Sequence, residues 1–156
     1  MKGFFASALL VATLLPVPRA ALAATYPVDD SASQVLDSSL RMKWDSVAPQ
    51  SGHGAGVTGI TTVLVRLDTA TWNGRQGRIY MVLPEQPIGQ VSASWTTRGP
   101  LLPGALRSGE RALVYAGPLR SNLIEDTLRL VIQADGQRLV RTEQLRFSFE
   151  IDLETP

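Results

Sequence analysis

The sequence predicts an all-β protein, an antiparallel immunoglobulin-like β-sandwich of about seven or eight strands. Three observations lead to this prediction. Short segments in which apolar and polar residues alternate recur along the chain. Clusters of Gly, Pro, Asn and Asp separate these segments, as expected for turns. After the N-terminal leader, no segment sustains the apolar spacing of an amphipathic helix beyond about two turns.

Residues 1–24 are predicted to be a cleavable secretory signal peptide. Lys2 gives a positive start, Gly3 to Leu15 is an apolar run, and Ala21-Leu22-Ala23 supplies the small residues of a cleavage site. The run is too short for a membrane-spanning helix, which needs about 20 apolar residues, and no later stretch is long enough. We therefore expect export, and no transmembrane segment in the mature chain.

Residues 25–38 are expected to form an N-terminal extension ahead of a single β-sandwich domain at residues 39–156. The extension is rich in Ser, Asp and Ala, and a loose period of two includes Tyr26 and Val28. Two interpretations stay open: the extension inserts into a neighbouring molecule as an added strand, or it is a disordered leader. Under the first interpretation, Tyr26 and Val28 are candidate partner contacts.

Seven segments within the chain are predicted to be strands. In order, they are Leu36–Trp44, Val57–Leu67, Arg78–Leu83, Val91–Thr96, Arg111–Ala116, Leu128–Ala134 and Leu145–Leu153. The last has an unbroken period of two with one wholly apolar face, which is typical of a half-buried strand. Asp135-Gly136, with Leu139 and Val140 resuming the apolar pattern, predicts a type I′ hairpin turn.

Two long loops interrupt this pattern. Residues 46–56 are polar and glycine-rich, and they include His53, the only histidine of the chain. Residues 97–110 contain several Gly and Pro residues around Leu101, Leu102 and Leu106. These leucines are expected either to fold back onto a sheet or to contact a partner, and Leu101 and Leu102 are therefore candidate contact residues.

Charge and cysteine content exclude several classes of protein. The chain has 15 basic and 14 acidic residues, and removal of Lys2 and Arg19 with the signal leaves 13 against 14, a net charge of −1. Nucleic-acid binding is not expected, because it needs a stripe of Lys and Arg. The chain contains no cysteine, which excludes disulfides, thiol catalysis and thiolate metal sites. A cysteine-free exported chain suits the periplasm or cell surface of a Gram-negative bacterium.

Candidate catalytic chemistry is weak. His53 has no predicted partner for serine catalysis and no second histidine for zinc. Glu125 and Asp126 are adjacent on a strand and should point to opposite faces, so they are not expected to form an acid–base pair. Alternate acidic residues on the last strand are expected to be a solvated charge row: Glu150, Asp152 and Glu154. No catalytic, cofactor-binding or metal-binding residue is predicted, although an enzyme that relies on carboxylates alone stays a third possibility.

The three tryptophans divide into two groups. Trp44 and Trp95 lie on the apolar faces of predicted strands and are expected to pack in the core. Trp72 lies at a predicted turn, in Thr71-Trp72-Asn73-Gly74. It is therefore the best single candidate for a ligand or partner contact. An equally favoured alternative is that the Trp72 side chain holds this turn onto the core.

The order of features resembles that of the cysteine-free subunits of alternate (CS1-type) chaperone–usher fimbriae. The resemblance covers most of the mature chain: the N-terminal extension, the Val63–Leu67 and Val91–Trp95 strands, and a closing pair of alternating strands. It implies an incomplete immunoglobulin-like domain, a periplasmic chaperone, an outer-membrane usher, and donation of the extension as a strand to the next subunit.

The leading functional hypothesis is an exported, non-enzymatic β-sandwich that acts through contacts with other protein subunits, in a fimbrium or another cell-surface assembly. The alternative is a small periplasmic carbohydrate- or ligand-binding module that uses Trp72 and the long loops. Self-association that depends on residues 25–38 favours the first hypothesis, and glycan binding that depends on Trp72 favours the second.

Overall fold

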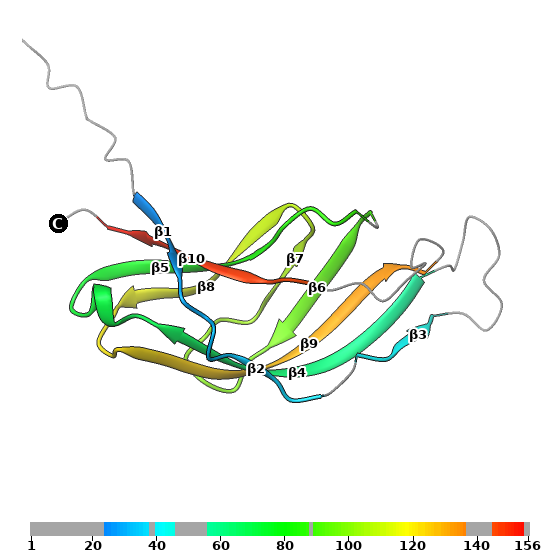
Figure 1. Cartoon of the computed structure of the whole chain (residues 1–156), viewed down its shortest axis with the longest axis horizontal. Coiled ribbons are helices and arrows are strands. Elements are labelled where there is room, and N and C mark those ends of the chain that lie inside the picture. The colour runs from blue at the N-terminus through cyan, green and yellow to red at the C-terminus, as the bar shows by residue number, and fades with distance from the viewer. Residues whose placement is uncertain (1–23, 38–39, 46–55, 88, 137–144, 155–156) are drawn as a thin grey trace, which may run out of the picture.

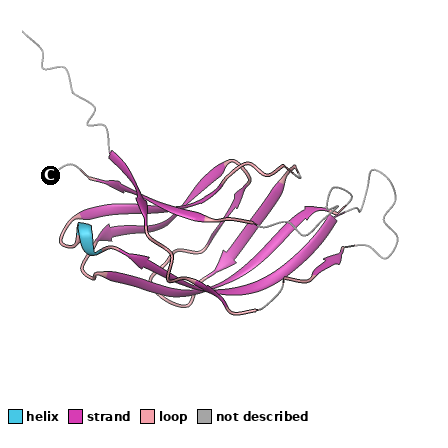
Figure 2. Cartoon of the chain, viewed as in Figure 1, coloured by secondary structure: helices cyan, strands magenta, loops and turns pink. Residues whose placement is uncertain are grey.

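The computed structural model describes residues 24–37, 40–45, 56–87, 89–136 and 145–154. It is a β-sandwich of two antiparallel sheets, which confirms the predicted all-β class (Figures 1 and 2). The described strands are β1 (Ala24–Val28), β2 (Gln34–Val35), β3 (Met42–Trp44), β4 (Gly56–Asp68), β5 (Gln76–Leu83), β6 (Val91–Thr96), β7 (Gly104–Arg107), β8 (Glu110–Pro118), β9 (Leu123–Asp135) and β10 (Ser148–Leu153). A 3-10 turn, η1 (Ala70–Trp72), precedes β5.

The two sheets differ in size and strand order. The four-stranded sheet has the order β1-β10-β5-β8, and the six-stranded sheet has the order β2-β4-β9-β6-β7, with β3 also paired to β4. β4 and β9 form the longest pairing, from Gly56 opposite Asp135 to Asp68 opposite Leu123. The two sheets therefore agree with the predicted sandwich. The immunoglobulin-like topology stays a prediction.

The core lies between the sheets, because alternate residues of the central strands point inward. β9 and β10 alternate between buried and more exposed positions, as their sequences predict. Trp95 is buried, with 3% of its surface exposed, and its Nε1–H donates to the Leu102 carbonyl at 2.9 Å. The prediction that Trp95 packs in the core is confirmed. Trp44 lies in β3, but its side chain is outside the described part of the structure.

Most predicted strands are confirmed, and three predictions need correction. The strand predicted for Leu36–Trp44 is reduced to β3, because Leu36 precedes it in a separate pairing with β4. The last strand begins at Ser148 rather than Leu145. β7 lies inside the segment predicted to be a long loop, since glycine and proline hide its short alternation. The hairpin predicted after Asp135-Gly136 continues into residues 137–144, outside the described residues, and the next described strand, β10, belongs to the other sheet.

The two lateral edges of the sandwich are closed in different ways. On one side, β7 and β8 are joined by the short Ser108-Gly109 turn and carry the chain from the six-stranded to the four-stranded sheet. On the other side, the N-terminal segment pairs first with β10 and then with β4, through an isolated bridge between Asp29 and Asp68. Figure 1 shows β1 beside β10 and β2 beside β4. The N-terminal segment therefore contributes an edge strand to both sheets.

Candidate functional site: the N-terminal edge strand

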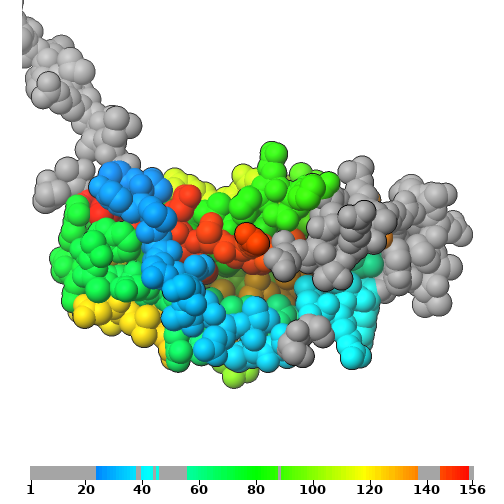
Figure 3. All heavy atoms as spheres, viewed as in Figure 1, coloured from blue at the N-terminus to red at the C-terminus, as the bar shows by residue number. Residues whose placement is uncertain are grey.

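β1 is attached to the domain mainly through its main chain. It pairs antiparallel with β10, from Ala24 opposite Leu153 to Val28 opposite Phe149. Of its five residues only Val28 is buried, with 5% of its surface exposed, and the other four are exposed. Figure 3 shows the N-terminal segment in blue, lying on the surface of the molecule against β10 in red. An edge strand with one buried side chain is held much less firmly than a central strand.

Tyr26 and Trp72 form an aromatic pair at this edge, on the face of β1 that also carries the buried Val28. Their ring centroids are 6.3 Å apart with an interplanar angle of 40°, within the range of attractive aromatic pairs. η1 holds Trp72 half-buried against the core, while 43% of Tyr26 is exposed. The structure thus brings together three of the predicted contact residues, Tyr26, Val28 and Trp72, at one place. Trp72 contacts both the core and β1. This agrees with the interpretation in which Trp72 holds its turn onto the core.

Asp152 is the side-chain hydrogen-bond partner of β1 within the described residues. The Thr25 hydroxyl donates to Asp152 Oδ1 at 2.6 Å, and the Arg111 guanidinium approaches Asp152 Oδ2 at 3.2 Å. The hydrogen bond from Thr25 is the largest cause, and Arg111 a further cause, of a pKa of Asp152 below its usual value of 3.8. Protonation of Asp152 therefore weakens the attachment of β1.

The predicted acidic row of the last strand forms ion pairs across the outer face of the four-stranded sheet. Arg111 on β8 approaches Glu150 at 3.8 Å in addition to Asp152, and Arg78 on β5 lies 3.3 Å from Glu154. The Arg111 guanidinium also lies 4.2 Å from the centre of the Tyr80 ring. These pairs are exposed and contribute little stability individually, but they neutralise the charge row.

Two aspartates lie where the chain leaves β1. Asp29 Oδ1 accepts a hydrogen bond from the Ser31 backbone N–H at 2.9 Å, and hydrogen bonding to Ser31 lowers the pKa of Asp29. Burial raises the pKa of Asp30. Asp29 also forms the bridge with Asp68, and the turn that follows, from Asp29 to Ser31, leads the chain on to β2.

The two candidate leucines of the 97–110 segment separate. Leu101 is buried in the core, with 2% exposed, whereas 43% of Leu102 is exposed. Leu101 is buried because its backbone N–H donates to Asp126 Oδ2 at 2.9 Å, which draws this part of the segment inward. As a surface contact, only Leu102 is accessible.

Asp126 is a structural residue that sequence reasoning missed. Its carboxylate is buried, with 4% exposed, and its other oxygen accepts N–H bonds from Arg98 at 3.1 Å, Gly99 at 2.7 Å and Thr127 at 2.6 Å. The sequence does contain a signal for this role, because Asp126 falls on the apolar face of β9. A carboxylate at a buried position needs hydrogen-bond donors around it. The predicted orientation of Glu125 and Asp126 to opposite faces is confirmed, since Glu125 is exposed.

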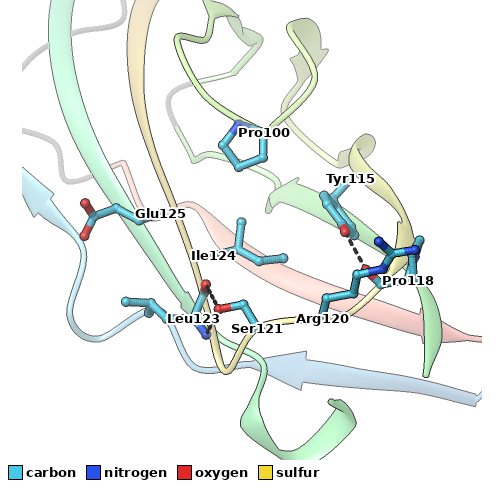
Figure 4. Close-up of a pocket in the computed structure, with 8 residues that line it drawn as sticks. All are labelled: Pro100, Tyr115, Pro118, Arg120, Ser121, Leu123, Ile124 and Glu125. Carbon is cyan, nitrogen blue, oxygen red and sulfur yellow. Dashed lines mark hydrogen bonds between the residues drawn. The ribbon is translucent and has the colours of Figure 1, made fainter. Parts of the chain in front are cut away.

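A separate hollow lies beside the start of β9. It has a volume of about 580 Å³ and is lined by Pro100, Tyr115, Pro118, Arg120, Ser121, Leu123, Ile124 and Glu125 (Figure 4). The Tyr115 hydroxyl donates to the Pro118 carbonyl at 2.8 Å, and Ser121 bonds the backbone of Leu123. Arg120 and Glu125 supply its charged groups. No group of metal ligands occurs among the described residues, and His53 lies outside them.

Comparisons of the chain with protein-family models, with curated proteins and with solved structures gave no match. Within the described residues, no helix has the length and apolar character required to cross a membrane.

Proposed function

We propose that this chain is an exported, non-enzymatic β-sandwich that acts through protein–protein contact, as a fimbrial or cell-surface assembly component of a Gram-negative bacterium. The observation that carries the proposal is the attachment of β1. Four of its five side chains are exposed, and its pairing with β10 is a main-chain interaction that another strand can supply equally well.

Release of β1 uncovers a complete binding edge. The inner face of β10 stays apolar, with Phe149, Ile151 and Leu153 in the core, while its outer edge gains free N–H and C=O groups. Departure of Val28 leaves one apolar gap next to these groups. An incoming strand with an apolar residue in the matching register fills the gap and restores the ladder.

The partners follow from this mode of contact and from the resemblance to alternate chaperone–usher fimbriae. Other subunits of an assembly are the proposed occupants of the β10 edge, and a periplasmic chaperone and an outer-membrane usher are the proposed assembly factors. Export with removal of residues 1–24 would place the mature N-terminus at the beginning of β1.

A reversible lock on β1 tests the proposal. Thr25 and Asp152 are cross-strand partners, so Thr25→Cys with Asp152→Cys joins β1 to its own β10 when oxidised. We expect the reduced protein to form larger species in size-exclusion chromatography with light scattering, and the oxidised protein to lose them. The control is Arg78→Cys with Ala116→Cys, which joins β5 to β8 and leaves β1 free. Equal assembly of the locked and control proteins would contradict the proposal.

The hollow of Figure 4 favours a second candidate function, a small carbohydrate- or ligand-binding module. Its apolar side chains suit the C–H face of a sugar or a small apolar ligand, and Arg120 and Glu125 supply polar contacts. A glycan panel screened with the wild-type protein, Arg120→Ala and Trp72→Ala tests this function. Binding lost only in Arg120→Ala assigns the hollow, and binding lost only in Trp72→Ala assigns the region of η1.

A further inference from the structure

The main-chain groups of β10 divide between its two neighbouring strands. Directly after β10, the Glu154 N–H donates to the Gln76 carbonyl at 3.2 Å, on the β5 side. Because main-chain groups alternate sides along a strand, the even-numbered residues of β10 face β5 and the odd-numbered residues face β1. The hydrogen-bonded partners on β1 are therefore the residues opposite the odd-numbered ones: Ala24, Tyr26 and Val28.

Thr25 and Pro27 consequently direct their main chain to the outer edge of β1. A second hydrogen bond agrees with this orientation, because the Asp29 carbonyl accepts the Asp68 N–H at 2.9 Å from the other sheet and so faces away from β10. Pro27, two residues earlier, faces the same way. Pro27 lies opposite Glu150 and is exposed, and it removes no hydrogen bond from the pairing of β1 with β10.

The outer edge of β1 lacks the groups that a further strand needs. Proline has no N–H, so the middle of this edge offers no donor, and the Asp29 carbonyl is already bonded to Asp68. Within β1, only Thr25 keeps both its N–H and its C=O free toward this side. β10 differs, since it contains no proline and its odd-numbered residues keep both groups. Proline on an edge strand prevents another strand from pairing there.

We propose that Pro27 closes the outer edge of β1 to strand addition, so that a partner strand reaches this sheet by displacing β1 and pairing with β10. Closure depends on β1 alone, whereas displacement rests on the proposed function. The register of the partner follows as well. Opposite the odd-numbered residues of β10 the incoming strand needs an N–H, while opposite Glu150 and Asp152 it tolerates proline. The partner is thus an extended segment with no proline at every second position.

Proline substitutions test the register. Tyr26→Pro removes an N–H that faces β10, so hydrogen exchange of the Phe149 and Leu153 amides should become about fivefold faster than in Tyr26→Ala, which loses the ring but keeps the N–H. Thr25→Pro changes an outward position, and its exchange should equal that of Thr25→Val, which also lacks the hydroxyl. Equal acceleration by proline at positions 25 and 26 would overturn the register.

The β1 lock tests the closure. In the oxidised Thr25→Cys with Asp152→Cys protein, β1 cannot leave, so a further strand can join this edge only by addition. We expect the locked protein to stay monomeric in size-exclusion chromatography with light scattering, and locked Pro27→Ala to form species of at least twice the monomer mass. Locked Pro87→Ala is the matched control, because Pro87 is exposed in the turn between β5 and β6, and it should stay monomeric.

Hydrogen exchange locates the new contact. The N–H that Pro27→Ala introduces faces solvent in the monomer, and it should become protected as the larger species form. Assembly without protection at position 27 would place the contact elsewhere and overturn the proposal. A locked Pro27→Ala protein that stays monomeric at the same concentrations would overturn it too.

The reduced proteins separate this inference from the proposed function. If reduced protein that retains Pro27 does not assemble while locked Pro27→Ala does, the proposed function fails and Pro27 still closes the edge. If the reduced protein assembles and locked Pro27→Ala stays monomeric, strand exchange stands and the inference about Pro27 is wrong. Assembly of the locked protein with Pro27 in place would contradict both.

Discussion

The two lateral edges of the sandwich differ in how firmly they are held. At the β7–β8 edge the chain is continuous, Trp95 and Leu106 are buried beside it, and the Asp126 carboxylate binds the backbone of the segment that leads to it. At the β1 edge, Val28 is the one buried residue of the strand. A sandwich can thus have one permanent edge and one replaceable edge, and strand exchange requires the second.

The largest expected effect is at the permanent edge. Asp126→Ala removes the acceptor of four backbone N–H groups, and because one of these bonds is buried and three are partly buried, we expect a loss of about 3 kcal/mol in the free energy of unfolding. Urea denaturation followed by Trp fluorescence measures this loss. Glu125→Ala, the exposed neighbour, is expected to change stability by about 1 kcal/mol or less. Similar midpoints for the two variants would show that the permanent edge does not depend on Asp126.

The second prediction concerns the anchor of the replaceable edge. Val28→Ala removes two methyl groups from the core, and we expect it to lower the free energy of unfolding by about 1–2 kcal/mol. Its distinctive effect is local: hydrogen exchange of the β1 and β10 amides that pair with each other should accelerate more than exchange in β9. Uniform acceleration over all strands would mean that β1 opens only with the whole domain, and that the edges do not differ.

The central strands could be predicted from the sequence, whereas the two edges that differ could not, for a physical reason. Central strands such as β6 and β10 alternate strictly because one face meets the core and the other meets water. β1 and β7 do not show this alternation clearly, because an edge strand buries few side chains. Their pairing depends on main-chain hydrogen bonds, which the side-chain pattern of the sequence does not reveal.

The residues of the candidate site could be predicted from the sequence, but their arrangement in space could not. Tyr26, Val28 and Trp72 could be selected as residues, but their meeting depends on the long-range pairing of β1 with β10. Leu101 and Leu102 are adjacent and chemically identical, and long-range hydrogen bonds, from Leu101 to Asp126 and from Leu102 to Val114, fix which one is buried. Contacts between residues distant in the chain are the information that local patterns lack.

A smaller effect is expected from the aromatic contact on β1. Tyr26→Ala removes the ring that packs beside Trp72, and we expect a loss of about 0.5–1.5 kcal/mol in the stability of the β1 attachment. Limited proteolysis near the N-terminus measures this attachment, and cleavage should become faster in the variant. Leu123→Ala, an exposed leucine outside β1, serves as the control and should leave the cleavage rate unchanged.

The smallest effect is a dependence of the β1 attachment on pH. Because the folded-state pKa of Asp152 lies below 3.8, its contribution is complete above that pH and is lost as the pH falls through the folded-state value. Its surroundings are Thr25 on β1, Arg111 on β8, Arg78 on β5 and Glu150 on β10, and Thr25 is the largest influence. Asp30 acts with the opposite sign, since its raised pKa favours the folded state on protonation.

Thr25→Val isolates the Asp152 contribution, because it removes the 2.6 Å hydrogen bond and leaves Arg111 and Asp30 in place. As the pH falls from about 4 to about 2, the range below the ordinary pKa of an aspartate, wild-type proteolysis of β1 should accelerate more steeply than that of the variant. The β7–β8 edge should show no such difference between the two proteins, since its anchoring carboxylate belongs to Asp126 and does not contact β1. Parallel pH profiles for wild type and Thr25→Val would mean that main-chain pairing alone holds β1, which would make the replaceable edge independent of acid.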